Sequence, residues 1–236
     1  MGFVETKFVG VRKIIAETMM KSLQSTAQYS TDIEVDASNL VKTKDELSTN
    51  FLSEAGIKLT YTPLFVKIVS NVISEFPLIN SIVEGDTIKT FEEINVSIAV
   101  DTENGLMVPV LKNVEKKSLR EIALGVEDLA KKARSGTLNF EDIVDGTFTI
   151  TNVGMYGVIS FTPILNIPQV AILGTGAIIK EPVFKENKVQ VSDILHLSLT
   201  ADHRVVDGAL SAKFLKSIKD IIEDEALLKS ILIKEA

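Results

Sequence analysis

The chain has 236 residues, of which 45% are hydrophobic and 24% charged, and it is long enough to bury a sizeable core. Its formal net charge of -7 argues against nucleic acid as a partner, because interfaces with a phosphate backbone need clustered lysine and arginine. The absence of cysteine excludes disulfides, thiolate metal sites and a cysteine nucleophile, and it fits an intracellular setting. The longest apolar runs are too short for a membrane span, which needs about 20 apolar residues.

The first half of the chain alternates between helical and extended patterns. Apolar residues recur at helical spacing directly after Gly10, which predicts an amphipathic helix. Pro63 suits the first turn of a later helix, and Pro77 is expected to end it. In chain order we predict a helix at 11–26, a strand at 29–38, a helix at 39–52 and a helix at 63–76.

The second half is richer in strand patterns. Residues 87–100 suggest two strands joined by a polar turn, and the pair Asn104-Gly105 predicts a tight turn between strands. A charged amphipathic helix is expected at 118–134, where Ser118 and Glu121 match a capping box. Further strands are predicted at 146–154, 168–179, 188–194 and 195–200, and a helix at 209–232.

No internal repeat, low-complexity stretch or Pro/Gly/Ser-rich linker interrupts this order of elements, so residues 1–236 read as one domain. The helices and strands are mixed without a regular strand–helix–strand alternation. This favours an α+β or irregular α/β fold with a mixed β-sheet covered by helices.

Histidine is scarce, with only two examples, His196 and His203. His196 lies within a strand whose leucines occupy the other face, so a structural or solvent-facing role is the simpler interpretation. His203 follows that strand, in a segment that also holds Asp202, Arg204 and Asp207. Charged neighbours of this kind can orient a catalytic imidazole, so His203 is the candidate for acid/base chemistry near neutral pH.

Other interpretations of these residues stay open. Asp207 precedes a predicted helix and suits its N-cap, a role that is compatible with a functional one. A metal site formed by His196, Asp202, His203 and Asp207 is a third possibility, although the chain lacks a dense ligand pattern. The glycine pairs in TNVGMYG and LGTGA match no dinucleotide or phosphate-binding loop and read as turn glycines, and no hydrolase serine elbow is present.

The segment HRVVDG at 203–208 resembles the H-x-x-x-D-G signature of the catalytic domain of dihydrolipoyl acyltransferases, the core components of 2-oxo acid dehydrogenase complexes. Further segments that resemble the family occur in family order from about residue 8 to residue 228. They are VGVRKIIAETM, LTYTPLFVKIV, EFPLINS, NVSIAVDTENGLMVPVLKN, KSLREIA and FTITNVGMYGVISFTPILNIPQVAILGTG.

The resemblance implies a chloramphenicol acetyltransferase-like fold, assembled as trimers that build a larger hollow core, with active sites at subunit interfaces. The implied reaction is acyl transfer between a dihydrolipoyl thiol and coenzyme A. By position, His203 would be the general base, Asp207 the orienting carboxylate and Thr151 the oxyanion donor, where the family usually has serine. Arg12 would pair with Asp207, and Asp202 is a departure because many members carry a second histidine there.

The lipoyl and subunit-binding domains that family members usually carry are not seen in this sequence, which suggests a catalytic-core fragment. The expected partners are further copies of the chain, a lipoyl domain, and the dehydrogenase and dihydrolipoamide dehydrogenase components, in the cytoplasm or in the mitochondrial matrix of a eukaryote. The motif favours acetyl or branched-chain acyl groups over succinyl. Two alternatives are an acetyltransferase acting on a small hydroxyl acceptor and a non-catalytic assembly scaffold.

Overall fold

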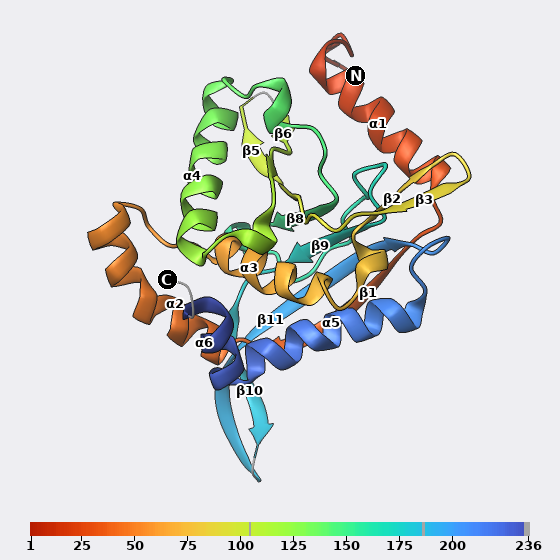
Figure 1. Cartoon of the computed structure of the whole chain (residues 1–236). Helices are drawn as coiled ribbons and strands as arrows, with labels where there is room; N and C mark the ends of the chain where they lie inside the picture. Colours follow the sequence, from red (N-terminus) through yellow and green to blue (C-terminus); the bar gives the residue numbers. More distant parts are fainter. Residues whose placement is uncertain (104, 186, 234–236) are drawn as a thin grey trace.

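The computed structural model describes residues 1–103, 105–185 and 187–233 (Figure 1). Its helices are α1 (Val11–Ser25), α2 (Ser38–Asn50), α3 (Tyr61–Ile73), α4 (Leu119–Ser135), α5 (Gly208–Glu223) and α6 (Glu225–Ile233). Its strands are β1 (Gln28–Asp36), β2 (Ser81–Glu84), β3 (Thr87–Thr90), β4 (Val96–Ile98), β5 (Val100–Thr102), β6 (Gly105–Met107), β7 (Val110–Leu111), β8 (Phe148–Asn152), β9 (Ala171–Thr175), β10 (Ile179–Lys185) and β11 (Lys188–Asp202).

The main sheet is mixed, as predicted. Its strand order is β1-β11-β9-β8-β4-β7, and β10 pairs with the first half of β11. Strand β8 runs parallel to both β4 and β9, whereas the other pairs in this sheet are antiparallel. Two small hairpins, β2-β3 and β5-β6, lie outside it.

Alternation along β11 separates an apolar face of the sheet from a polar one. Leu195, Leu197 and Leu199 are fully buried, and α5 and α2 pack against the strands on the apolar side. Burying one such leucine contributes about 2 kcal/mol to stability. The intervening side chains, Ser198 and Thr200, are hydrogen-bonded to β1, which confirms the predicted polar face.

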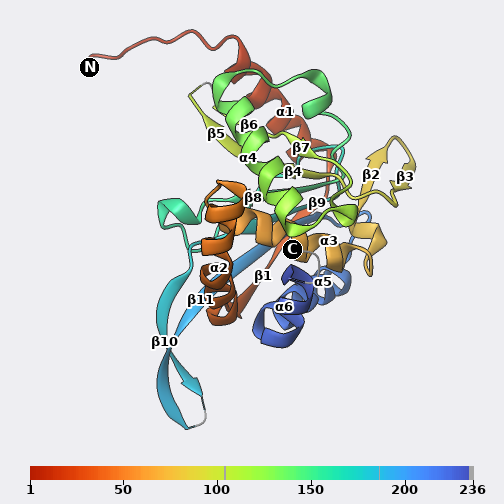
Figure 2. The ribbon, with the colours of Figure 1, turned by 60° about the vertical axis from the view of Figure 1, so that its left-hand side comes forward.

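Helix α1 has the predicted amphipathic pattern, but little of its apolar face is covered within the chain. Val11, Ile14, Met20 and Leu23 are each more than half exposed. Figure 2 shows the preceding residues extending away from the body of the molecule. This N-terminal segment carries further exposed apolar side chains, among them Phe3 and Phe8.

Several predicted boundaries differ from the structure. The two strands expected between 188 and 200 form one continuous strand, β11, whose first half projects with β10 as an arm (Figures 1 and 2). Strand β3 pairs with β2, which the sequence did not predict, and not with the strand that follows it. The predicted helix at 209–232 is two helices, because Asp224 leaves the helical conformation and its carboxylate accepts from Leu227 N at 3.0 Å.

The capping box predicted for the helix at 118–134 is confirmed. Ser118 and Glu121 form the capping box at the start of α4. Gly105 begins β6 opposite Thr102, whereas Asn104 of the predicted turn lies outside the described residues. None of the helices in the described ranges is both long and apolar enough to cross a membrane.

Candidate active site

His203 lies in a tight turn between β11 and α5. Within the turn, the amides of Val205 and Val206 both donate to Asp202 O. The His203 amide donates to Ala27 O at 3.0 Å, which ties the turn to the start of β1. The His203 side chain itself is exposed, so it is accessible to a substrate or to another chain.

Asp202 stabilises this turn through its buried carboxylate. Its side chain is almost fully buried and accepts hydrogen bonds from Arg204 Nε at 3.0 Å, Arg204 Nη2 at 2.6 Å and Ala27 N at 3.3 Å. Burial tends to raise the pKa of the Asp202 carboxyl, but the hydrogen bonds from Arg204 and Ala27 outweigh burial and lower it. The negative charge of Asp202 is therefore paired with the positive charge of Arg204.

Asp207 is the N-cap of α5. Its backbone is extended, and its carboxylate accepts from Leu210 N at 2.7 Å, as the N-cap interpretation predicts. Among the described residues, no hydrogen bond or ion pair joins this exposed carboxylate to His203. Its orienting role toward the imidazole stays a prediction.

Thr151 lies far from His203 within one chain. In the sheet register Thr151 is level with Gly174, which is level with Ser198 on β11. His203 follows Ser198 by five positions, and Thr151 is two strands away, so their Cα atoms are roughly 20 Å apart at the usual strand spacings. The two side chains therefore cannot act on one small substrate group from the same copy of the chain.

The predicted pairing of Arg12 with Asp207 does not occur within the chain. Arg12 stands at the exposed N-terminal end of α1, whereas the other end, near Ser25, approaches the His203 turn. The helix separates the two ends by about 20 Å at 1.5 Å per residue. Figures 1 and 2 both show the start of α1 directed away from the start of α5, where Asp207 lies.

The four candidate metal ligands do not form a metal site in the described part of the chain. No group of three or more histidine, aspartate or glutamate side chains there could hold an ion. His196 is half-buried opposite Glu34 on β1, and Asp202 is bound to Arg204.

The glycine pairs do more than form turns, because they allow two backbone segments to meet beside Thr151. A Cβ on Gly176 would lie 1.8 Å from Ile159 O, and one on Gly154 would lie 2.5 Å from Gly176 O. The loop that follows Thr151 is thereby held against the end of β9, where Ala177 N also donates to Val158 O at 2.7 Å.

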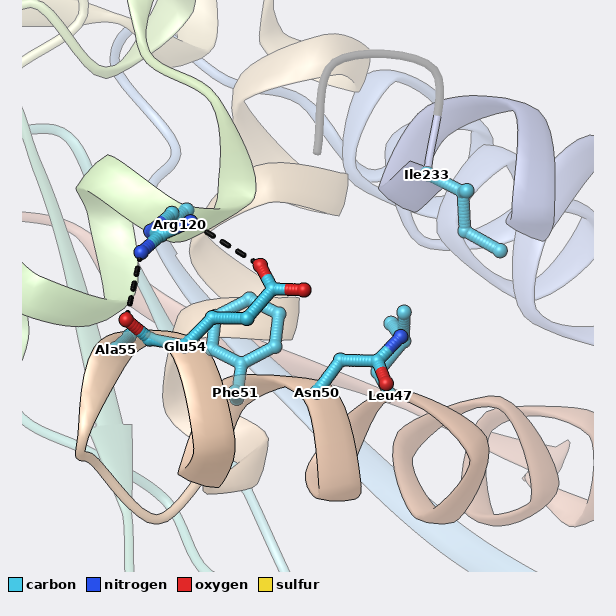
Figure 3. Close-up of a pocket in the computed structure, with 7 residues that line it drawn as sticks. All are labelled: Leu47, Asn50, Phe51, Glu54, Ala55, Arg120 and Ile233. Atoms are coloured by element: carbon cyan, nitrogen blue, oxygen red, sulfur yellow. Dashed lines mark hydrogen bonds and ion pairs between the residues drawn. The ribbon is translucent and has the colours of Figure 1, made fainter.

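A cavity of about 260 Å³ lies elsewhere, between α2, α4 and the end of α6 (Figure 3). Leu47, Phe51 and Ile233 supply apolar walls, and Arg120 donates to Glu54 O at 2.9 Å at its rim. Neither His203, Asp207 nor Thr151 lines it, so this cavity is not the candidate active site.

Two residues near His203 had no signal in the sequence. The Tyr29 ring contacts the His203 ring with centroids 4.9 Å apart. The Gln28 side chain accepts from Leu165 N at 3.1 Å and donates to Ser22 Oγ at 3.1 Å and to Thr26 Oγ1 at 2.8 Å. Only the pairing of β1 with β11 brings them to the histidine turn.

The family model described as 2-oxoacid dehydrogenases acyltransferase (catalytic domain) matches residues 2–229. The chain belongs to this acyltransferase family. It is 41% identical over 223 residues to the lipoamide acyltransferase component of the branched-chain alpha-keto acid dehydrogenase complex of Bacillus subtilis, covering 94% of the chain and 53% of that relative. It is 38% identical to the dihydrolipoyllysine-residue acetyltransferase component of the pyruvate dehydrogenase complex of the same organism, covering 96% of the chain and 52% of that relative. The chain thus spans about half the length of these relatives.

Solved structures of the acyltransferase family share the fold. A probable dihydrolipoamide acetyltransferase from Listeria monocytogenes superimposes with a TM-score of 0.90 at 39% identity, covering 100% of this chain and 98% of that one. The cubic core of a pyruvate dehydrogenase multienzyme complex gives a TM-score of 0.92 at 33% identity, covering 98% and 95%. A chloramphenicol acetyltransferase at 14% identity, with a TM-score of 0.53 and coverage of 88% and 94%, supports the predicted fold class alone.

Proposed function

We propose that residues 1–236 form the catalytic domain of a dihydrolipoyl acyltransferase, which moves an acyl group between a dihydrolipoyl thiol and coenzyme A in a 2-oxo acid dehydrogenase complex. The family match over residues 2–229 carries this proposal. Coenzyme A is a substrate, and the dihydrolipoyl group arrives on a lipoyl domain.

In the proposed reaction His203 is the general base. A free thiol has an ordinary pKa of about 8.5 and is mostly protonated at neutral pH, whereas an ordinary imidazole, at about 6.5, is mostly free to accept a proton. The imidazole removes the proton of the coenzyme A thiol as its sulfur attacks the thioester carbon. The tetrahedral intermediate then collapses, the dihydrolipoyl sulfur leaves, and the imidazolium returns the proton to it.

Thr151 is the proposed oxyanion donor, and Asp207 the proposed orienting carboxylate. The Thr151 hydroxyl would donate a hydrogen bond to the oxygen that becomes negative in the intermediate, an interaction that can contribute about 3 kcal/mol. Because His203 and Thr151 are far apart in one chain, we propose that they come from two neighbouring copies. Arg12 would then support the site from an adjoining copy.

Self-assembly into trimers and a larger core is part of the proposal. The exposed apolar residues of α1 and the N-terminal segment support it, because uncovered apolar surface of this kind marks interaction sites. Met155 and Tyr156, in the loop after Thr151, are also exposed. The lipoyl domain, the dehydrogenase component and dihydrolipoamide dehydrogenase are the further proposed partners.

The acyl group is proposed to be acetyl or branched-chain. The relatives whose names carry these two specificities differ little in identity, 41% against 38%. A methylene or two changes discrimination by only about 1–3 kcal/mol, so small changes in the pocket decide between them. We also propose a cytoplasmic location, or the mitochondrial matrix in a eukaryote, from the family assignment; subcellular fractionation tests this.

The proposal is tested by thioester exchange between free dihydrolipoamide and acetyl-CoA, isobutyryl-CoA or succinyl-CoA in turn. We expect transfer from at least one of the first two donors, and a loss of about 10²-fold or more in His203→Ala. His196→Ala is the control, since it removes the other histidine. No transfer from any donor by an assembled oligomer would contradict the proposal and favour a scaffold, and transfer only to a hydroxyl acceptor would favour the other alternative.

A further inference from the structure

The backbone around His203 is fixed on both sides, which leaves the orientation of its side chain to be explained. Ala27 accepts from the His203 amide at 3.0 Å and donates to Asp202 Oδ1 at 3.3 Å. The Asp202 carboxylate in turn accepts from three nitrogens of Arg204, its backbone amide, Nε and Nη2. The turn is thus held against the start of β1 by hydrogen bonds that do not involve the imidazole.

Among the described residues, the aromatic ring that contacts the His203 imidazole is that of Tyr29. The two ring centroids are 4.9 Å apart and the planes are tilted by 57°. Aromatic pairs at this separation favour tilted geometries and attract one another beyond the simple burial of area. The contact therefore favours one orientation of an otherwise exposed side chain.

Tyr29 is itself held in place at its far end. Its hydroxyl donates to Val206 O at 3.1 Å, and Val206 is fully buried. Burial raises the pKa of the Tyr29 phenol, so the hydroxyl keeps the proton that it donates. The tyrosine thereby spans the turn, with its ring against the first residue after β11 and its hydroxyl on a residue three positions later.

We propose that Tyr29 is a positioning residue for the reaction, and that its ring holds the His203 imidazole in the orientation from which it accepts a thiol proton. The inference rests on the proposed role of His203. The ring contact orients the imidazole, and the hydroxyl anchors the ring. Loss of the Tyr29 ring should consequently lower kcat more than loss of the Tyr29 hydroxyl does.

The test compares Tyr29→Leu, Tyr29→Phe and Tyr61→Leu in the full chain. Tyr61 is a half-buried tyrosine at the start of α3, away from His203, so its leucine variant controls for the loss of a partly buried ring. We expect Tyr29→Leu to lower kcat at least about tenfold with KM for the acyl-CoA nearly unchanged, because a misplaced base slows chemistry more than binding. The kcat of Tyr29→Phe should stay within about threefold of the wild-type value, and the kcat of Tyr61→Leu should equal the wild-type value.

A second readout does not depend on turnover. Diethyl pyrocarbonate modifies unprotonated imidazoles, and the two histidines can be followed separately by mass spectrometry, with His196 as the internal standard. Loss of the Tyr29 ring should raise the modification rate of His203 relative to that of His196 at least about threefold, since one face of the His203 imidazole becomes uncovered. If the wild type transfers no acyl group, the proposed function fails, whereas this ratio still decides the positioning role.

Two results would overturn the inference. One is a Tyr29→Leu variant with wild-type kcat and an unchanged modification ratio. The other is a Tyr29→Phe variant that loses as much activity as Tyr29→Leu, which would make the hydroxyl the group that orients the imidazole. If Tyr29→Leu fails to fold, Tyr29→Met replaces it, because methionine fills a similar volume with a flexible chain that cannot hold a ring in place.

Discussion

Ala27 is hydrogen-bonded to His203 at the edge of the sheet: the carbonyl of Ala27 accepts from the amide of His203 at 3.0 Å, and the amide of Ala27 donates to the carboxylate of the preceding residue, Asp202, at 3.3 Å. This relationship joins residues that are 176 positions apart in the chain. The start of β1 thereby fixes the backbone of an exposed turn that carries the proposed general base, His203.

Replacing Asp202 by asparagine should destabilise the protein by about 1–3 kcal/mol at neutral pH, since buried hydrogen bonds of a charged group are lost. Burial alone would raise the pKa of Asp202, but the hydrogen bonds from Arg204 and Ala27 bring it below the ordinary value of 3.8. The ionised form is therefore stabilising above about pH 4, and this contribution disappears as the pH falls through the lowered pKa. Urea unfolding should show a smaller difference in the free energy of unfolding between the wild type and Asp202→Asn near pH 3 than at pH 7.

The matched control for Asp202 is Asp220→Asn, which removes an exposed carboxylate paired with Lys216 on the same helix. Its effect should stay below about 0.5 kcal/mol at either pH. A wild-type stability for Asp202→Asn at pH 7, or a difference from the wild type that is independent of pH, would show that the buried carboxylate does not anchor the turn.

Two substitutions of Asp207 separate its role as the N-cap of α5 from the effect of its negative charge on His203. Asp207→Ala should lower the free energy of unfolding by about 1 kcal/mol, because Leu210 N loses its acceptor. Asp207→Asn keeps an acceptor oxygen, so its thermal midpoint should stay near that of the wild type. If the charge also orients His203, the asparagine variant loses kcat while it keeps its stability. Equal activity of the asparagine variant and the wild type would leave Asp207 as a helix cap only.

Thr151 should act through its hydroxyl. Thr151→Val preserves shape and removes the donor, and we expect kcat to fall by about 10²-fold with KM little changed. Thr151→Ser keeps the donor and should retain most of the activity. Steady-state kinetics with the preferred acyl-CoA measures both, and an active valine variant would remove Thr151 from the mechanism.

Gly176 should tolerate no side chain. A Cβ there would meet Ile159 O at 1.8 Å, a backbone atom that cannot move alone, so Gly176→Ala should unfold the loop beside Thr151 or prevent soluble expression. Gly208→Ala is the stability control, since its Cβ would meet nothing within 4 Å. Equal thermal midpoints for the two variants would contradict this account of the close approach.

The local pattern predicted those parts of the structure that depend on near neighbours. The capping box of α4 and the N-cap of α5 follow from residues three positions apart, and both are present. The leucine face of β11 follows from alternation. By contrast, the continuity of β11 and the pairing of β2 with β3 depend on partners that alternation does not identify.

The candidate site shows the same division. The sequence singled out His203 because charges surround it locally, yet its contact with Tyr29 arises only from the register of β1 against β11. Arg12 and Asp207 do not pair within one chain, because a straight helix carries the two groups apart, so the pairing stays a prediction. The distance between Thr151 and His203 likewise follows from the strand order, which no short motif encodes.

Coassembly of two inactive variants tests whether this chain transfers acyl groups at a site shared between two copies, as proposed. His203→Ala and Thr151→Val are each expected to be nearly inactive alone. When they are unfolded together and reassembled in equal amounts, a site that takes its histidine from one copy and its threonine from the next is intact at about a quarter of the interfaces, so about a quarter of the wild-type activity should return. Activity no higher than that of the separate variants, in a mixed and fully assembled oligomer, would contradict the shared site.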